Sequence, residues 1–286
     1  MSLPLGPRLR RALDRLEAAG EPLPVDELAR RLLALRAPVP ALLARRLVAT
    51  ALGCGAEGLP ERLDLRALPR LLAGPCAEVD LEDADWIAVD LETTGLSTAS
   101  AILEIGAVRG VGLRMVDRFQ TLVDPGVPIP AAITALTGID RGAIGGAPPI
   151  SRAIAAFRAW VGDRPATAFA AHNAAFDAGF VRRAFAAHGL APWPGPVVCT
   201  RRLARRLLPG LPRYDLDTLC AQLGIANAWR HRALGDAEAA ARALVELVER
   251  ARVLRGLRSL GDLLDLQGSR TRKGRRSRPP VGPPKP

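Results

Sequence analysis

The sequence lacks any hydrophobic run long enough to cross a membrane. No stretch approaches 18 uninterrupted apolar residues, and roughly that number is needed for a helical span. The first twenty residues also lack the apolar core of a secretory signal peptide. We therefore expect no membrane association, and a cytoplasmic protein rather than a secreted or periplasmic one.

Cysteine is scarce, and lysine is almost absent. No two of the four cysteines form a CxxC pair, so the sequence argues against a zinc finger and predicts reduced, buried thiols. Only two of the 40 basic residues are lysine, and alanine, glycine and proline are abundant. This pattern indicates a GC-rich coding bias, so the number of arginines is weak evidence of function. The cysteines are Cys54, Cys76, Cys199 and Cys220.

The net charge of +11 is concentrated near one end of the chain. Residues 1–84 carry 12 basic and 12 acidic side chains, whereas residues 267–286 carry seven basic side chains and no acidic one. The last part of the chain is also rich in proline and has no apolar anchors. We therefore expect residues 257–286 to form a basic, disordered tail.

Residues 1–75 are predicted to form a small all-helical domain. Leu9, Leu13 and Leu16 recur at helical spacing, and further helices are expected after Pro24 and after Pro40. Short helices joined by proline and glycine resemble a winged-helix or helix-turn-helix module. The alternative is a generic helical bundle for packing or partner docking, which the absence of net charge favours, because DNA-reading helices are usually basic. Acidic residues 76–84 are expected to form a linker.

Residues 85–256 predict a second domain of the α/β class. Strands expected at 86–92, 102–108 and 113–123 follow one another and form an antiparallel meander, with a turn at 109–112. Strands and helices then alternate, which is typical of a mixed sheet flanked by helices. Helices are expected at 148–161, 174–188, 201–208, 216–223 and 236–255, and short strands at 166–171 and 197–199.

Two carboxylates lie side by side on the first strand of this domain. Asp90 and Glu92 share one face because strand side chains alternate, while Val89 and Leu91 face the core. Adjacent carboxylates repel each other unless a cation lies between them, and oxygen ligands favour Mg²⁺ or Mn²⁺. The alternative is a solvated polar strand end.

Two later segments place further ionisable residues at helix starts. His172 and Asp177 lie where a short buried strand leads into a helix, and His231 and Asp236 precede or begin the last long helix. Each carboxylate has a simpler interpretation, as a helix cap or a favourable charge at a helix N-terminus. His172 could be a buried core histidine. Imidazole titrates near neutral pH, however, and therefore suits a general base.

These segments together resemble the DEDD exonuclease superfamily in its histidine branch. VDLETTG resembles the first motif of that family, HNAAFDAGF the second and HRALGDAEA the third, and ITALTGID resembles the stretch before the second. Within the family, the sequence is most similar to the proofreading (epsilon) subunits of bacterial DNA polymerase III and their stand-alone relatives. The other branch has a tyrosine where Arg232 stands here. The resemblance covers about residues 85–250.

The resemblance implies a ribonuclease H-like fold and assigns roles to ten residues. Two divalent cations, Mg²⁺ or Mn²⁺, would be held by carboxylates, and His231 would be the general base. Residues beside the carboxylates would contact the terminal nucleotide. The implied ligands are Asp90, Glu92, Asp177 and Asp236, and the implied substrate contacts are Thr93, Thr94, Gly95, His172 and Asn173.

The implied activity is metal-dependent 3′–5′ exonuclease action on DNA. It would release 5′-mononucleotides from a single-stranded or frayed 3′ end, in proofreading or repair, with a DNA polymerase or repair protein as partner. A 3′–5′ exoribonuclease of the same superfamily is one alternative, and a nucleic-acid-binding adaptor with an inactive nuclease domain is another. Ala132 and Thr137 stand where the polymerase-associated form has a glutamate and a histidine near the terminal nucleotide.

Overall fold

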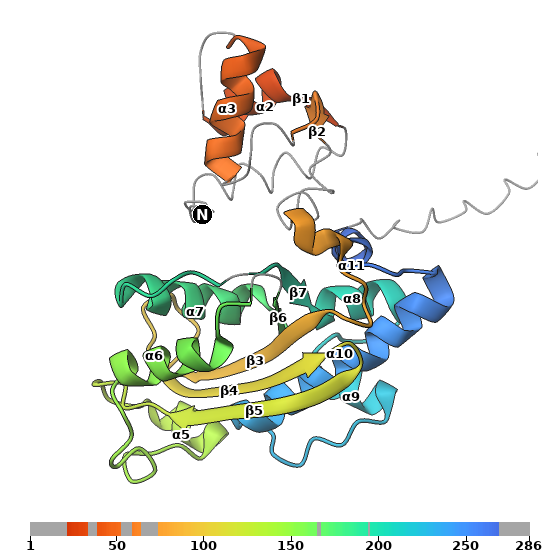
Figure 1. The fold of residues 1–286 in the computed structure, drawn as a ribbon. Coiled ribbons are helices and arrows are strands. Elements are labelled where there is room, and N and C mark those ends of the chain that lie inside the picture. Colours follow the sequence, from red (N-terminus) through yellow and green to blue (C-terminus); the bar gives the residue numbers. More distant parts are fainter. Residues whose placement is uncertain are drawn as a thin grey trace, which may run out of the picture.

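The computed structural model describes residues 22–33, 39–52, 59–63, 74–164, 167–193 and 195–268. Its main body is a five-stranded mixed sheet with the strand order β5-β4-β3-β6-β7 and helices on both faces (Figure 1). β3, β4 and β5 are antiparallel neighbours, and β6 and β7 extend the sheet in parallel with β3. The predicted α/β class is therefore confirmed. The strands are β3 (Asp85–Thr93), β4 (Ile102–Val111), β5 (Arg114–Leu122), β6 (Ala168–Ala171) and β7 (Val197–Cys199).

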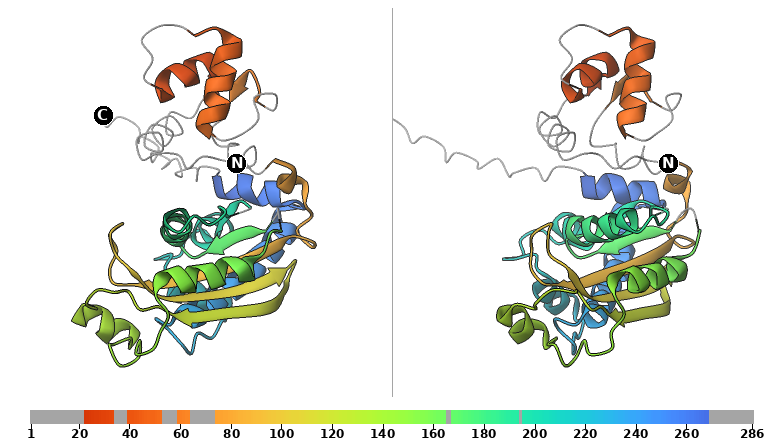
Figure 2. Two further views of the ribbon diagram at one scale, coloured as in Figure 1. Left: turned by 60° about the vertical axis from the view of Figure 1, so that its left-hand side comes forward. Right: turned by 90° about the vertical axis from the view of Figure 1, so that its left-hand side faces the viewer.

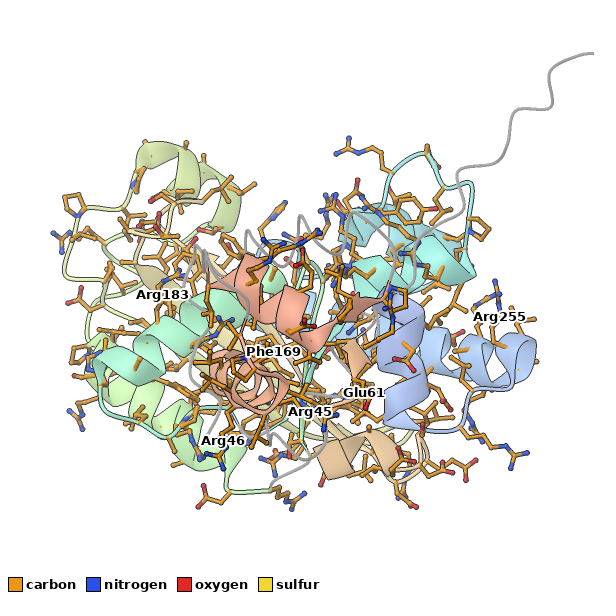
Figure 3. The ribbon with its side chains drawn as sticks, turned by 90° about the horizontal axis from the view of Figure 1, so that it is seen from above. Arg45, Arg46, Glu61, Phe169, Arg183 and Arg255 are labelled. Atoms are coloured by element: carbon orange, nitrogen blue, oxygen red, sulfur yellow. The ribbon has the colours of Figure 1, made fainter. Side chains whose placement is uncertain are left out.

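Alternation along β3 divides the domain core into two layers. Trp86 and Ala88 face the long helix α10 (Ala233–Arg255), and Ile87 and Val89 face α6 (Ile150–Val161) and α7 (Ala175–Ala187). This pattern follows from the two-residue period of a strand. Phe169 of β6 lies deep in the second layer, while Arg255 projects at the far end of α10 (Figure 3). Asp90 and Glu92 have the parity of Trp86 and therefore face α10.

The turn predicted at 109–112 begins later than expected. β4 continues through Val111, and the reversal occurs at Gly112, which has a φ of +55° and donates its N–H to the Ala84 carbonyl. Gly110 stays in the strand because the Trp86 ring packs against it, where a Cβ would approach the ring within 2.0 Å. Both glycines are needed, but only Gly112 makes the turn.

Two of three further helices of the domain were predicted from the sequence. α8 (Thr200–Leu207) and α9 (Leu216–Leu223) were expected, whereas α5 (Ala131–Thr137) was not. α5 has seven residues and ends at Gly138 in the left-handed conformation, so its periodic signal in the sequence is weak. α10 begins at Ala233, three residues before the predicted start.

The predicted tail and its boundary at residue 256 need correction. Residues Leu260–Gly268 form a further helix, α11, and its leucines 260, 263 and 264 are buried in the core layer that α10 covers. The Gln267 side chain bonds the edge strand β7 through Cys199 N at 2.9 Å and Val197 O at 2.8 Å. The sheet domain therefore extends to residue 268, and residues 269–286 lie outside the described part.

The predicted linker at 76–84 packs against this added helix. Its first three residues belong to the short helix η1 (Gly74–Glu78), which lies beside α11 in both views of Figure 2. Asp80 and Ser259 form an isolated β-bridge, with Leu81 N donating to Arg258 O at 2.7 Å. Leu81 is itself buried, so the segment belongs to the domain.

The N-terminal segment contains two of the expected helices and a strand pair. α2 (Val25–Leu32) and α3 (Ala41–Leu52) pack through Leu28 and Val48, while β1 (Leu23–Pro24) pairs with β2 (Arg62–Leu63). The segment is therefore not purely helical. The helix expected around Leu9, Leu13 and Leu16 lies outside the described residues.

Two expectations from composition can be compared with the described residues. No described helix is long and apolar enough to span a membrane. Cys199 and Cys220 are buried free thiols as expected, Cys76 is half-buried, and Cys54 lies outside the described part.

Candidate functional site

The site lies where three parallel strands end at the same edge of the sheet. Ala88, Ala170 and Val198 are neighbours across β3, β6 and β7. Two residues beyond these three positions in the sequence lie Asp90, His172 and Thr200, respectively. Open sheets with parallel strands bind ligands at this edge, so the register alone brings the first and second motifs together.

Asp90 and Glu92 face the start of α10 from β3. Burial raises the pKa of Asp90 well above its ordinary value, and the charges of Asp177, Asp236 and Glu92 raise it further. Burial, followed by the charges of Asp236 and Glu104, raises the pKa of Glu92 to about 7. These shifts indicate carboxylates packed together with insufficient positive charge among them.

Asp177 joins this group from the first turn of α7. Its side chain is buried, and burial raises its pKa to about 8, while the backbone N–H groups of Asp177 and Leu91 act in the opposite direction. The contact with Leu91 places the carboxylate against β3. A charge at the helix N-terminus is favourable, but it does not explain burial among other carboxylates.

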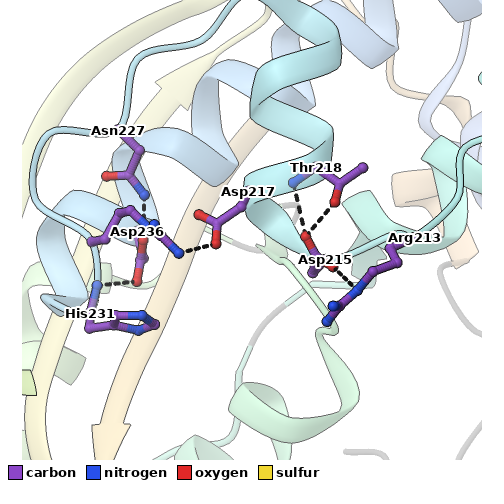
Figure 4. A network of polar contacts seen from close by, with 8 residues as sticks. Arg213, Asp215, Asp217, Thr218, Asn227, His231 and Asp236 are labelled. Carbon is purple, nitrogen blue, oxygen red and sulfur yellow. Dashed lines mark hydrogen bonds and ion pairs between the residues drawn. The ribbon is translucent and has the colours of Figure 1, made fainter. Parts of the chain in front are cut away.

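Asp236 is held from both sides by the loop that precedes α10 (Figure 4). Asn227 Nδ2 donates to its Oδ1 at 2.5 Å, and the backbone N–H of His231 donates to its Oδ2 at 2.9 Å. His231 has a φ of +57°, which is rare outside glycine and common at functional sites. Ligand atoms of Glu92, His231 and Asp236 lie within 4.8 Å of one another. The loop thus brings the histidine and the carboxylate to the same point.

A fifth carboxylate, Glu104, was missed in the sequence. It lies opposite Glu92 on β4, is fully buried, and accepts hydrogen bonds from Gln120, from the Arg232 guanidinium and from Ala233 N. The last of these bonds caps α10, a role that the sequence suggested for Asp236. The signal was present: a lone carboxylate in an apolar strand must find partners when it is buried.

The two expected substrate-contact residues of the second motif, His172 and Asn173, differ in their surroundings. His172 Nδ1 bonds Thr200 Oγ1 and His172 Nε2 meets the Tyr214 carbonyl, both at 3.0 Å, and burial lowers the pKa of His172 to about 4. A neutral His172 therefore joins β6 to α8. Asn173 beside it is exposed with a φ of +68°.

The loop after β3 is fixed by its own threonines. Thr93 Oγ1 donates to the Gly95 carbonyl at 2.7 Å, and Thr94 Oγ1 accepts from Ala101 N at 2.9 Å. The loop therefore keeps its shape next to Glu92. Contact of Thr93, Thr94, Gly95, His172 and Asn173 with a nucleotide stays a prediction.

The sequence of this domain matches a known family. The profile of the exonuclease family RNase_T matches residues 87–244, which is more than half of the chain and contains every residue of the acidic cluster. The chain belongs to this exonuclease family. Its acidic cluster is accordingly the candidate active site of a nuclease.

The chain is also similar to individual proteins. The chain is 37% identical over 176 residues to a PolC-type DNA polymerase III of Halalkalibacterium halodurans, covering 61% of this chain and 12% of the polymerase. It is 40% identical over 163 residues to the corresponding protein of Clostridium perfringens, covering 57% of this chain and 11% of that protein. The chain thus spans a small part of these relatives.

The fold is that of ribonuclease H-like exonucleases. Exonuclease I of E. coli, solved with a dT13 oligonucleotide, superposes with a TM-score of 0.54 at 18% identity, over 60% of this chain and 42% of that one. At this identity the likeness concerns the fold alone. It agrees with the mixed sheet and flanking helices described above.

Proposed function

We propose that this protein is a metal-dependent 3′–5′ exonuclease of the histidine branch, which removes 5′-mononucleotides from DNA 3′ ends. The observation that carries the proposal is the convergence of Asp90, Glu92, Asp177 and Asp236 beside His231. Four carboxylates that all have raised pKa values favour a bound cation over mutual repulsion.

The cluster fits divalent cations by its chemistry. Carboxylate oxygens are the ligands that Mg²⁺ and Mn²⁺ prefer, and the structure offers Asp90, Glu92, Asp177 and Asp236 to hold two of them. When bound, such ions would activate a water molecule and stabilise the charge that develops on the scissile phosphate. Asp177 and Asp236 are held by backbone N–H groups, which orient their carboxylates in advance.

His231 is proposed to accept the proton of the attacking water. Its backbone is fixed by Asp236, and its ring lies in the group formed with Glu92 and Asp236. The next residue, Arg232, stands where the other branch has its tyrosine, and its guanidinium is bound to Glu104. This arrangement supports His231, and not Arg232, as the base.

DNA is the substrate we propose, with a polymerase or a repair protein as partner. Sequence relatives that are DNA polymerases support both parts of this proposal. We place the reaction in the cytoplasm, where these processes occur in bacteria. The same chemistry would cleave RNA, because the attacked phosphodiester is common to both polymers.

One observation bears on the proofreading role and not on the choice between DNA and RNA. Thr137 is buried, donates its hydroxyl to Ile133 O at 2.9 Å and accepts from Ile139 N at 3.1 Å. It therefore serves the end of α5 and offers nothing to a nucleotide. The contacts of a terminal nucleotide in this region would differ from those of a polymerase-associated proofreading form.

The deciding experiment compares three substrates. Purified protein with Mn²⁺ or Mg²⁺ is assayed on 5′-labelled single-stranded DNA, a mismatched primer–template and RNA of the same sequence, with Asp90→Asn as control. We expect a ladder that shortens from the 3′ end, mononucleotide products, and a higher kcat/KM on DNA. A higher value on RNA would transfer the proposal to the exoribonuclease, and Asp90→Asn activity equal to wild type would refute it.

A further inference from the structure

We propose that one face of α8 binds the phosphate backbone of the nucleic-acid strand whose end lies in the active site. This surface, the arginine face, consists of Arg201, Arg202, Arg205 and Arg206. The proposal rests on the proposed exonuclease function and names where the rest of the substrate lies. It assigns these arginines to strand binding and leaves the chemical step to the acidic cluster.

The arginine face begins at the active-site edge of the sheet. α8 starts at Thr200, directly after β7, and the Thr200 hydroxyl contacts the His172 ring at 3.0 Å. The other ring nitrogen of His172 meets Tyr214, whose ring lies 5.5 Å from the Arg205 guanidinium. Contacts therefore connect the helix to the second motif at both its first and its second turn.

Packing fixes which way the arginines point. Thr200, Leu203, Ala204 and Leu207 are buried on one side of α8, in the layer that α10 and α11 complete. The arginines lie on the remaining side: Arg202 and Arg205 are exposed, and Arg201 and Arg206 are half-buried. Figure 1 shows α8 next to β7 and α11. Because the apolar side of α8 packs in the core, the side that carries the arginines faces away from it, toward solvent.

No described carboxylate neutralises the charge on this face. Among the described residues, no carboxylate forms an ion pair with any of the four arginines, whereas Arg158, Arg213, Arg230 and Arg232 each pair with an aspartate or glutamate. Burial and the charges of Arg202 and Arg205 lower the pKa of Arg206. The buried Nε atoms of Arg201 and Arg206 also lack hydrogen-bond partners. Four like charges held this close favour an anionic ligand.

A row of phosphates fits this surface better than a single anion. The helix is about 12 Å long at 1.5 Å per residue, so its charges are spread along a line. Guanidinium groups bind phosphate through paired hydrogen bonds. Arginine is common throughout the chain, and several other described arginines also have no ion pair, so what distinguishes this face is that four of them lie together on one helix that begins at the active-site end of β7.

The test neutralises the two exposed members of the face. Arg202→Gln/Arg205→Gln is compared with Arg114→Gln/Arg255→Gln, which removes the same charge from exposed arginines far from the site. Arg114 lies at the opposite end of the strands, and Arg255 ends α10. Affinity for a dT oligonucleotide is measured in EDTA over a salt series, followed by kcat and KM with Mn²⁺.

We expect the α8 variant to bind about tenfold more weakly at low salt. Each phosphate contact that is lost should make the slope of log K against log salt shallower by about 0.7 for a single strand. KM should rise and kcat should stay the same. Hydrolysis of the p-nitrophenyl ester of thymidine 5′-monophosphate should not change, because that substrate is too short to reach α8.

Other outcomes have definite meanings. Equal salt slopes for the two double variants would overturn the arginine face as a strand-binding surface. A parallel loss on the small ester would also overturn it, because the substitutions would then act on the active site itself. If the wild type cleaves none of the substrates, the exonuclease proposal fails, while the salt slopes in EDTA still decide whether α8 binds the strand.

Discussion

Arg232 donates hydrogen bonds to both carboxylate oxygens of Glu104, from Nη2 to Oε1 at 2.9 Å and from Nε to Oε2 at 3.1 Å. Glu104 is the third residue of β4 and is fully buried, and Arg232 directly follows His231. Ala233 N donates to the same carboxylate at 3.0 Å. The loop that carries the histidine is thus attached to the sheet one residue beyond it.

Arg232→Gln should therefore slow the reaction without weakening substrate binding. We expect kcat to fall about 10–100-fold, because small displacements of a reacting group have effects of that size, and KM to stay nearly constant. Arg232→Lys should recover part of the rate, since it restores the charge beside Glu104 but not the paired hydrogen bonds. Single-turnover rates at saturating DNA provide the measurement.

A double-mutant cycle tests whether Arg232 affects the rate through His231. If Arg232 acts by positioning His231, adding Arg232→Gln to His231→Ala should cause no further loss. Additive losses would mean that Arg232 acts on the carboxylates instead. A normal circular dichroism spectrum serves as the control for folding.

His231→Ala should mainly affect the chemical step. Loss of a general base lowers rates about 10²–10⁴-fold, and we expect this loss in kcat with a small change in the Mn²⁺ concentration for half-maximal activity. His231→Gln provides a matched variant that cannot accept the proton. Full recovery of either variant at high Mn²⁺ would show that the imidazole is a metal ligand.

The metal-free protein should become less stable as the pH rises from 6 to 8.5. Burial raises the pKa of Glu92 to about 7 and of Asp177 to about 8, whereas both groups titrate near pH 4 in an unfolded chain. In this window the native state binds more protons than the unfolded state, so the free energy of unfolding falls with pH. Thermal melts in EDTA measure the trend, and saturating Mn²⁺ should flatten it.

Asp177→Asn should stabilise the metal-free protein while abolishing activity. The substitution removes a buried charge, and the asparagine side chain has nearly the same shape as aspartate. At pH 8 we therefore expect the free energy of unfolding to rise by about 1–2 kcal/mol, or Tm to rise by a few degrees. The exposed Asp83 gives the control variant Asp83→Asn, which should change neither property. Lower stability of Asp177→Asn in EDTA would contradict the repulsion described for this cluster.

Two truncations distinguish the added helix from the residues after it. Ending the chain at 256 removes three buried leucines of α11, each contributing about 2 kcal/mol, as well as the bonds from Gln267 to β7. We expect a large loss of stability, measured by urea unfolding. Ending it at 268 should leave the unfolding curve close to that of the full chain. Equal curves for the two truncations would show that α11 contributes little.

Local patterns explain why much of this fold was predictable. The alternation along β3 identified the shared face of Asp90 and Glu92, and this face is observed toward α10. Residues within one motif, such as His231 and Asp236, are five positions apart and meet through their own loop. Such features depend on residues that are close in the sequence, so they can be predicted from one sequence alone.

Features that depend on distant partners were missed. Glu104 is held by Arg232, 128 residues away. Its place in an apolar strand indicates that it needs partners, but no local pattern identifies the residue that supplies them. α11 is short and gains its place through Gln267 and through the bridge between Asp80 and Ser259. The same limit applies to α10, where a carboxylate from β4, rather than Asp236, satisfies the first N–H.

The bridge at Asp80 and Ser259 has a consequence for how this nuclease unit can be arranged in longer proteins. Leu81 N donates to Arg258 O at 2.7 Å and Leu260 N donates to Val79 O at 2.8 Å, so the chain enters the domain beside the start of α11, its last described helix. Units with neighbouring ends tolerate insertion and circular permutation. This domain could be inserted into one surface loop of a larger protein, because its neighbouring ends would keep the two sides of that loop close together. Joining residue 268, at the end of α11, to residue 74, at the start of η1, by a linker and opening the chain at an exposed loop should accordingly leave the domain folded, because α11 and η1 are both retained.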